Sequence, residues 1–222
     1  MNTIKKKESY QEVINNATTS REYAEVASKI KKILKDDEWA EQILNMAIDN
    51  IHSFDDGLFV QPVVKYTFPE VLPSFAPLML NLADTVEELL YANDLYLAHE
   101  NKVQCQKILK MAEKKALCIY DYLQLCSSIE LLDPGWAVKI YNKAEDEAEI
   151  FEDYIMILNE GSYFYSWPKF LNIEKVKKLA SNAVSLAEKA DDFKKLSDFF
   201  IYYRDKLDPS IREKRLKKII SG

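Results

Sequence analysis

The sequence predicts an all-α fold: a short α-solenoid of stacked antiparallel helical hairpins, arranged as a right-handed superhelix or a compact helical array. Apolar residues recur at helical spacing along most of the 222 residues. Only four glycines are present, whereas a hairpin-rich β fold needs glycine in many of its turns. The hydrophobic share of 48% is that of a folded protein. We therefore predict one helical domain over residues 1–222.

The most clearly marked helix is predicted over residues 133–148. Asp133 is suited to cap the first free backbone amides, and Pro134 to occupy the first helical position. One face then carries apolar and small residues at a period near 3.6: Trp136, Ala137, Ile140, Tyr141, Ala144 and Ala148. The pattern is an Ala, a large apolar residue four positions on, and an Ala three further, and it is typical of a packing unit.

The same pattern occurs twice upstream. One copy begins with Trp39 and Ala40, and a weaker copy has Gln104 and Cys105 at the same positions. The intervals between the copies indicate a unit of about 32 to 33 residues, which is the length of a helical hairpin. Because one hairpin cannot bury its own apolar face, neighbouring hairpins must stack. We expect Trp39 and Trp136 to be equivalent, each wedged between helices of its own and a neighbouring hairpin.

Two segments depart from this pattern. The copy expected near residue 72 is missing, and residues 58–82 carry four prolines, which are incompatible with a regular helix. We predict an irregular insertion there, either packed by its own aromatic side chains or serving as a functional loop. Residues 1–17 are predicted to be a frayed lead-in, because the first helix start is marked by a capping-box spacing at Thr19 and Glu22.

The small and large residues of the predicted second helices resemble those of tetratricopeptide-type repeats, and Sel1-like repeats use a similar scheme. Ala137, Tyr141 and Ala144 carry this resemblance most clearly. It implies stacked antiparallel helices with a groove. It implies no catalytic or ligand-binding residue.

Composition restricts the expected partners and compartment. The formal net charge of −6 disfavours nucleic acid, whose phosphates bind cationic surface. No apolar run approaches the roughly 18 residues that cross a bilayer, and the N-terminus lacks the apolar core of a signal peptide. Three cysteines fit a reducing compartment better than a disulfide framework. We expect a cytoplasmic protein that binds neither nucleic acid nor membrane.

No cluster of residues predicts catalysis, a metal site or a cofactor. The glycines are too far apart for a phosphate-binding loop. His52, Asp55 and Asp56 could approach one another at a helix end, but a solvated helix terminus explains them better. Cys118 and Cys126 are separated by about 12 Å along a helix, too far for a disulfide. We expect a protein that is not an enzyme and has no metal or cofactor.

One stretch is not explained by helix packing. Residues 163–170 hold five aromatic side chains and follow Gly161. Aromatic residues with a polar handle are enriched in interface hot spots. The stretch either folds onto a neighbouring hairpin or forms part of a partner-binding face with the segment 58–82. On the second interpretation the contact residues are Tyr163, Tyr165, Trp167 and Phe170.

Three functions stay open at this point. The sequence favours a non-enzymatic module that binds a protein or peptide partner, because a packing pattern is present and catalytic motifs are absent. A narrower alternative is an acidic inhibitor or immunity-type protein that neutralises a basic partner. The third is an enzyme whose site is assembled from scattered residues.

Overall fold

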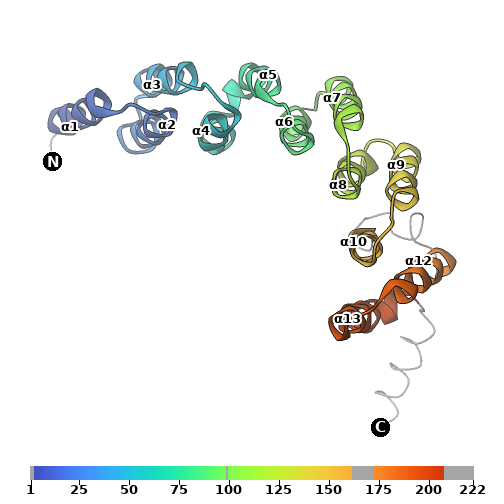
Figure 1. Cartoon of the computed structure of the whole chain (residues 1–222). Helices are drawn as coiled ribbons and strands as arrows, with labels where there is room; N and C mark the ends of the chain where they lie inside the picture. Colours follow the sequence, from blue (N-terminus) through green and yellow to red (C-terminus); the bar gives the residue numbers. More distant parts are fainter. Residues whose placement is uncertain (1–2, 99, 162–172, 208–222) are drawn as a thin grey trace, which may run out of the picture. The chain divides into compact units, whose positions relative to one another are not determined.

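The structure is a computed structural model that describes residues 3–98, 100–161 and 173–207, and every element in these ranges is a helix (Figure 1). The predicted all-α class is confirmed. None of the helices in these ranges combines the length and apolarity needed to cross a membrane. The chain divides into two compact units, Met1–Ile108 and Leu109–Gly222, and each is described by itself. The single domain over residues 1–222 stays a prediction.

The first unit has two rows of helices, with α2, α4 and α6 in one row and α3 and α5 in the other (Figure 1). Helix α2 packs against α3 and α4, α4 packs against α5, and α5 against α6. A π-helical turn, Ile30–Leu34, extends α2, and a 3-10 turn, Pro69–Val71, joins α4 to α5. The helices are α1 Thr3–Asn16, α2 Ser20–Lys29, α3 Asp37–Asp49, α4 Phe54–Thr67, α5 Leu72–Leu82, α6 Val86–Ala98 and α7 Lys102–Lys115, which runs across the boundary of the two units.

The second unit begins with the same order of contacts. Helix α8 packs against α9 and α10, and α10 packs against α12 and α13. Figure 1 shows α8, α10 and α13 in one row, with α9 and α12 in the other. The helices are α8 Ile119–Glu130, α9 Pro134–Asp146, α10 Phe151–Gly161, α12 Ile173–Leu186 and α13 Ala190–Leu207. We refer to α2, α4, α6, α8, α10 and α13 as first helices, and to α3, α5, α7, α9 and α12 as second helices.

Each first helix begins with a carboxylate at its third position, here named the cap carboxylate. In α2 the Glu22 carboxylate accepts hydrogen bonds from the backbone N–H groups of Thr18 and Thr19, at 2.9 and 3.0 Å. These bonds pair donors that the helix cannot satisfy internally. The equivalent cap carboxylates are Asp56, Glu88, Asp121, Asp153 and Asp192. Their spacing is about 32 to 34 residues, except for a longer interval before Asp192.

Each second helix buries four residues at positions i, i+3, i+4 and i+7, a spacing that places them on one face. We name these the buried quartet. In α9 the quartet is the predicted pattern of Ala137, Ile140, Tyr141 and Ala144. The other quartets of Ala-type pattern are Ala40, Ile43, Leu44 and Ala47 in α3, Cys105, Ile108, Leu109 and Ala112 in α7, and Val176, Leu179, Ala180 and Ala183 in α12.

The prediction of an irregular insertion over residues 58–82 is wrong. These residues belong to α4 and α5, and α5 has a buried quartet of its own: Leu72, Phe75, Ala76 and Met79. It stands at the position where a copy of the pattern was expected and missing. Leu72 and Met79 replace the small residues at the two ends of the quartet, so the Ala-based pattern does not detect it.

The four prolines of this hairpin do not break it, because all four are exposed to solvent. Pro73 lies in the first turn of α5, where a missing N–H costs nothing. Pro62 and Pro77 lie inside α4 and α5. On an exposed helix face, water can bond the carbonyl that a proline leaves without its usual partner.

Met79 fits in its quartet because Gly57 lies opposite it in α4. A Cβ atom built on Gly57 would lie 2.1 Å from Met79 Sδ and 2.7 Å from Met79 Cε, closer than two such atoms can approach. In the other first helices, the residue after the cap carboxylate is large: Tyr23, Leu89, Tyr122, Tyr154 and Phe193. In the α4–α5 hairpin the small residue, Gly57, is therefore on the first helix and the large residue, Met79, on the second, which is the reverse of the other hairpins.

Two further expectations need correction. The frayed lead-in predicted over residues 1–17 is not seen in its described part, because Thr3–Asn16 forms α1 and the Lys7 ammonium lies 2.6 Å from the Asp36 carboxylate at the start of α3. Trp39 and Trp136 do occupy equivalent positions, each at the third residue of a helix whose Asp cap accepts its N–H. Both indoles are half-buried rather than wedged in the core, because the third position of a second helix lies beside the buried quartet and not within it.

Candidate functional site

The most exposed aromatic side chains of the first unit lie on two consecutive first helices. Phe59 and Tyr66 of α4 are 52% and 76% exposed, and Tyr91 of α6 is 36% exposed. Pro62 lies between the two α4 rings and is also exposed. Residues three and four apart share one face of a helix, so each helix presents one stripe. We name Phe59, Pro62, Tyr66, Tyr91 and Asp94 the aromatic face.

Contacts between α4 and α6 hold Tyr91 in place. Its hydroxyl donates a hydrogen bond to Gln61 Oε1 at 3.1 Å, and its ring meets the Phe54 ring edge-to-face with centroids 6.0 Å apart. Phe54 and Gln61 are buried. The ring is therefore positioned before any partner arrives, which reduces the entropy lost on binding.

Both exposed rings of α4 lie beside a cation. The Arg21 guanidinium of α2 lies 5.3 Å from the Phe59 ring centroid, and Lys65 Nζ lies 5.6 Å from the Tyr66 centroid. Arg21 Nε also pairs with the Glu25 carboxylate at 3.0 Å. These contacts show that the π faces of the two rings are accessible to positive charge.

Electrostatic interactions link the middle of α6 to the end of α4. Desolvation raises the pKa of the Asp94 carboxyl above its ordinary value, and the nearby Lys65 ammonium opposes that shift. Desolvation also raises the pKa of Tyr91, with smaller contributions from Asp94 and Tyr66. Asp94 thus interacts with Lys65, and Tyr91 with Asp94 and Tyr66.

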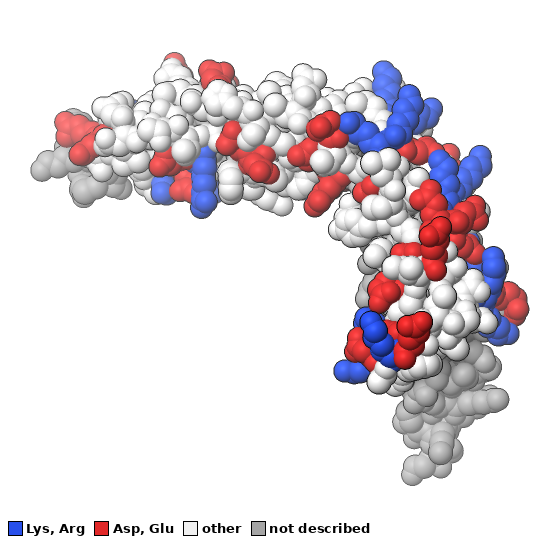
Figure 2. All heavy atoms as spheres, in the orientation of Figure 1, with Lys and Arg blue, Asp and Glu red and all other residues white. Residues whose placement is uncertain are grey.

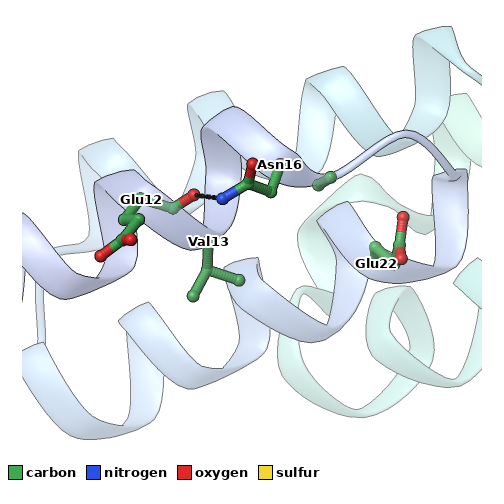
Figure 3. Close-up of a pocket in the computed structure, with 5 residues that line it drawn as sticks. Glu12, Val13, Asn16 and Glu22 are labelled. Carbon is green, nitrogen blue, oxygen red and sulfur yellow. Dashed lines mark hydrogen bonds between the residues drawn. The ribbon is translucent and has the colours of Figure 1, made fainter.

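A pocket of about 340 Å³ lies where α1 meets α2 (Figure 3). Glu12, Val13, Asn16, Ala17 and Glu22 line it. Its polar groups serve the helix ends: the Asn16 amide donates to the Glu12 carbonyl, and the Glu22 carboxylate caps α2. The hydrogen bonds explain these groups as structural, and the pocket brings together no acid–base pair or nucleophile.

Metal and acid–base chemistry find little support elsewhere in the described residues. Within residues 3–98, 100–161 and 173–207, no three His, Cys, Asp or Glu side chains are grouped so as to hold a metal ion. Near the predicted helix end, Asp56 accepts the backbone N–H groups of His52 and Ser53 at 3.1 and 3.0 Å. The side-chain hydrogen bond with Ser53 is the largest cause that lowers the pKa of Asp56, and the backbone N–H groups of His52 and Ser53 lower it further. Asp56 thus has a capping role.

A charged network in the second unit joins α9 to α12. Lys175 Nζ lies 2.6 Å from Glu145 Oε2, 2.8 Å from Asn142 Oδ1 and 4.7 Å from the Tyr141 ring centroid. Burial raises the pKa of the Tyr141 hydroxyl, which donates to the Ile157 carbonyl at 3.2 Å. The Lys175 charge is balanced by Glu145, so the network is explained by helix packing.

The lysines of α7 form a second charged surface. Figure 2 shows basic side chains gathered over this helix. They are exposed and lie along one helix: Lys102, Lys107, Lys110, Lys114 and Lys115. A charged helix face in contact with water needs no partner to explain it, so this surface is a weaker candidate than the aromatic face.

The sequence-predicted binding residues Tyr163, Tyr165, Trp167 and Phe170 lie outside the described residues. The other predicted segment, 58–82, contributes Phe59, Pro62 and Tyr66 to the aromatic face. No sequence pattern singled out Tyr91 and Asp94. The spacing of Phe59, Pro62 and Tyr66 was a detectable signal, since it matches one face of a helix.

Comparison with known proteins identifies no relative: no protein family, curated protein or solved structure matches the chain.

Proposed function

We propose that this chain is a helical-repeat array of the α-solenoid type, similar in architecture to tetratricopeptide proteins, and that it binds a segment of a protein partner on its aromatic face. One observation carries the proposal: aromatic side chains are exposed on two consecutive first helices, α4 and α6, whose other faces are buried. The role is one of binding, without catalysis and without a cofactor.

The recurrence of two local arrangements supports the repeat. Cap carboxylates and buried quartets return at intervals of about 32 to 34 residues, apart from a longer last interval. Helix α2 contacts both α3 and α4, and α8 contacts both α9 and α10. Stacked hairpins of this kind present the exposed stripes of successive first helices side by side. Recognition then uses the stripes, because the quartets are occupied with packing.

The chemistry of the aromatic face supports binding. Tyr and other aromatic residues are enriched among the hot spots of protein interfaces. The rings stand on helices rather than on loose loops, and rigid elements hold a site more precisely. Tyr163, Tyr165, Trp167 and Phe170 remain candidates for a contact surface of their own.

Capture of the partner from the native organism tests the proposal. We expect the 222-residue chain to retain a protein that mass spectrometry identifies. Phe59→Ala with Tyr66→Ala should lose that protein by more than about tenfold, because truncating a hot spot costs about 2 kcal/mol or more.

Met46→Ala is the matched control, since Met46 is an exposed apolar residue of α3 in the same unit. It should capture the partner as the parent chain does. Equal capture by the Phe59/Tyr66 double variant, with its helical spectrum intact, would show that the aromatic face is not the binding surface.

A further inference from the structure

The aromatic face is also acidic, and this narrows the kind of partner. Its two helices expose three carboxylates, those of Asp55, Glu87 and Asp94, against the single ammonium of Lys65. Asp94 and Tyr91 lie on one stripe of α6, three residues apart, and the Tyr91 hydroxyl donates to Gln61 of α4, five residues before Tyr66. Aromatic rings and carboxylates are the two side-chain types that bind organic cations.

We propose that Tyr66, Tyr91 and Asp94 together receive a lysine or arginine side chain from a basic segment of the partner protein. This inference rests on the proposed function and adds the chemistry of the partner to it. The cationic head would lie over the Tyr66 ring and pair with the Asp94 carboxylate, while the rest of the segment covers Pro62 and Phe59.

The intramolecular contacts of the face support a cation at this position. Lys65 already lies 5.6 Å from the Tyr66 centroid, and Arg21 lies 5.3 Å from that of Phe59. The chain's own cations thus adopt the geometry that a partner's cation would need. Lys65 is on the same helix as Tyr66 and lies near the limit of about 6 Å for such contacts, so a partner side chain can replace it.

The environment of Asp94 also favours a cation. Its carboxylate is partly desolvated, which raises its pKa, and Lys65 compensates only in part. A bound lysine or arginine would supply the missing opposite charge, and charge-assisted hydrogen bonds are about twice as strong as neutral ones.

An acidic partner segment fits less well. Arg21 is already paired with Glu25 at 3.0 Å, so Lys65 is left as the main source of positive charge near the two tyrosines. An acidic segment would meet three carboxylates of like charge, which is unfavourable. The net charge of −6 for the whole chain also favours approach by a basic partner.

Selection from a phage library of random dodecapeptides tests the inference on the 222-residue chain. Enriched peptides are synthesised, and their Kd values are measured by fluorescence anisotropy against the parent chain and its variants. We expect enriched peptides to share a lysine or arginine, and its replacement by norleucine to weaken binding about tenfold.

Three variants locate the cation. Asp94→Asn should weaken the basic peptide about tenfold and leave the norleucine peptide unchanged. Tyr66→Ala should weaken the basic peptide, whereas Tyr66→Phe, which keeps the ring, should not. Glu41→Gln is the matched control, because Glu41 is an exposed carboxylate of α3 in the same unit, and it should have no effect beyond that of net charge.

The outcomes separate the two proposals. If enriched peptides are lost with the Phe59/Tyr66 double variant but contain no basic residue, or are indifferent to Asp94→Asn, the cation inference is overturned and the binding face stands. If no peptide depends on Phe59 and Tyr66, the proposed binding face is overturned, and the cation inference with it.

Discussion

The α4–α5 hairpin and the α8–α9 hairpin solve the same packing problem with opposite choices of residue size. In α8–α9 the first helix carries the large Tyr122 after its cap carboxylate, and the second helix ends its quartet with Ala144. In α4–α5 these positions hold Gly57 and Met79. The comparison shows that the volume shared by the two helices is what has to be filled, whichever helix supplies the large side chain.

The exchange also has a consequence for hydrogen bonding. The hydroxyls of Tyr23 and Tyr154 donate to the backbone carbonyls of Ala17 and Ala148, at 2.8 and 2.9 Å, and tie the first helix to the turn before it. Gly57 cannot make this bond. The α4–α5 hairpin therefore depends more on Met79 and on its cap at Asp56.

Removing the large residue from the exchanged pair should have the largest effect. Met79→Ala leaves a cavity opposite Gly57, and truncating a buried Met costs about 2–5 kcal/mol. Urea unfolding followed by far-UV circular dichroism should show a lower midpoint. Ala144→Met in α9 is the matched reverse change, and we expect it to destabilise by about 1–3 kcal/mol through overpacking. A parent-like midpoint for Met79→Ala would mean that Met79 is not part of the core.

Adding a side chain at the small position should be the next largest effect. Gly57→Leu places a Cβ within 2.1 Å of Met79 Sδ and should cost about 1–3 kcal/mol. The double variant Gly57→Leu with Met79→Ala recreates the arrangement of the other hairpins, so it should recover most of the stability that Gly57→Leu alone loses. A double variant as unstable as the sum of the two single changes would show that the positions do not share one volume.

Replacing an interior proline should give a smaller effect of the opposite sign. Pro77→Ala restores a backbone N–H on the exposed side of α5, and we expect this to raise the free energy of unfolding by about 1–2 kcal/mol. Because alanine also gives the unfolded chain more conformational entropy than proline, the net rise should be smaller. Thermal melting measures the change. Lys139→Ala on the exposed side of α9 is the control and should lie within about 0.5 kcal/mol of the parent. A lower melting temperature for Pro77→Ala would indicate that the proline shapes the helix.

Acid should weaken the caps, with the smallest effect of the four. Hydrogen bonds to the folded helix ends lower the pKa values of Glu22, Asp56 and Asp192. Each carboxylate contributes to the free energy of unfolding at a pH above the pKa that it has in the unfolded chain. This contribution is lost as the pH falls through the lower pKa that it has in the folded chain. Glu22→Gln should therefore melt at a lower temperature than the parent at pH 7, and the difference should close in acid. A gap that stays constant with pH would exclude a role for the Glu22 charge.

The all-α class, the interval of about 32 residues and several helix ends could be predicted from the sequence. These features depend on local patterns: apolar residues at helical spacing, a capping box at Thr19 and Glu22, and an Asp-Pro start at residues 133–134. Both predicted starts are present, because the hydrogen bonds that make a cap link residues only three or four positions apart.

The hairpin over residues 54–82 was decided by tertiary packing. Whether Met79 belongs to a core depends on Gly57, which lies in a different helix, and no local pattern connects the two. The prolines suggested a loop, but their effect on a helix depends on whether water reaches their side of it. Likewise, Phe59, Tyr66 and Tyr91 look like core residues in the sequence. They form the aromatic face because the neighbouring helices pack against the opposite sides of α4 and α6, and only the arrangement of those neighbours determines which side of a helix is left to solvent.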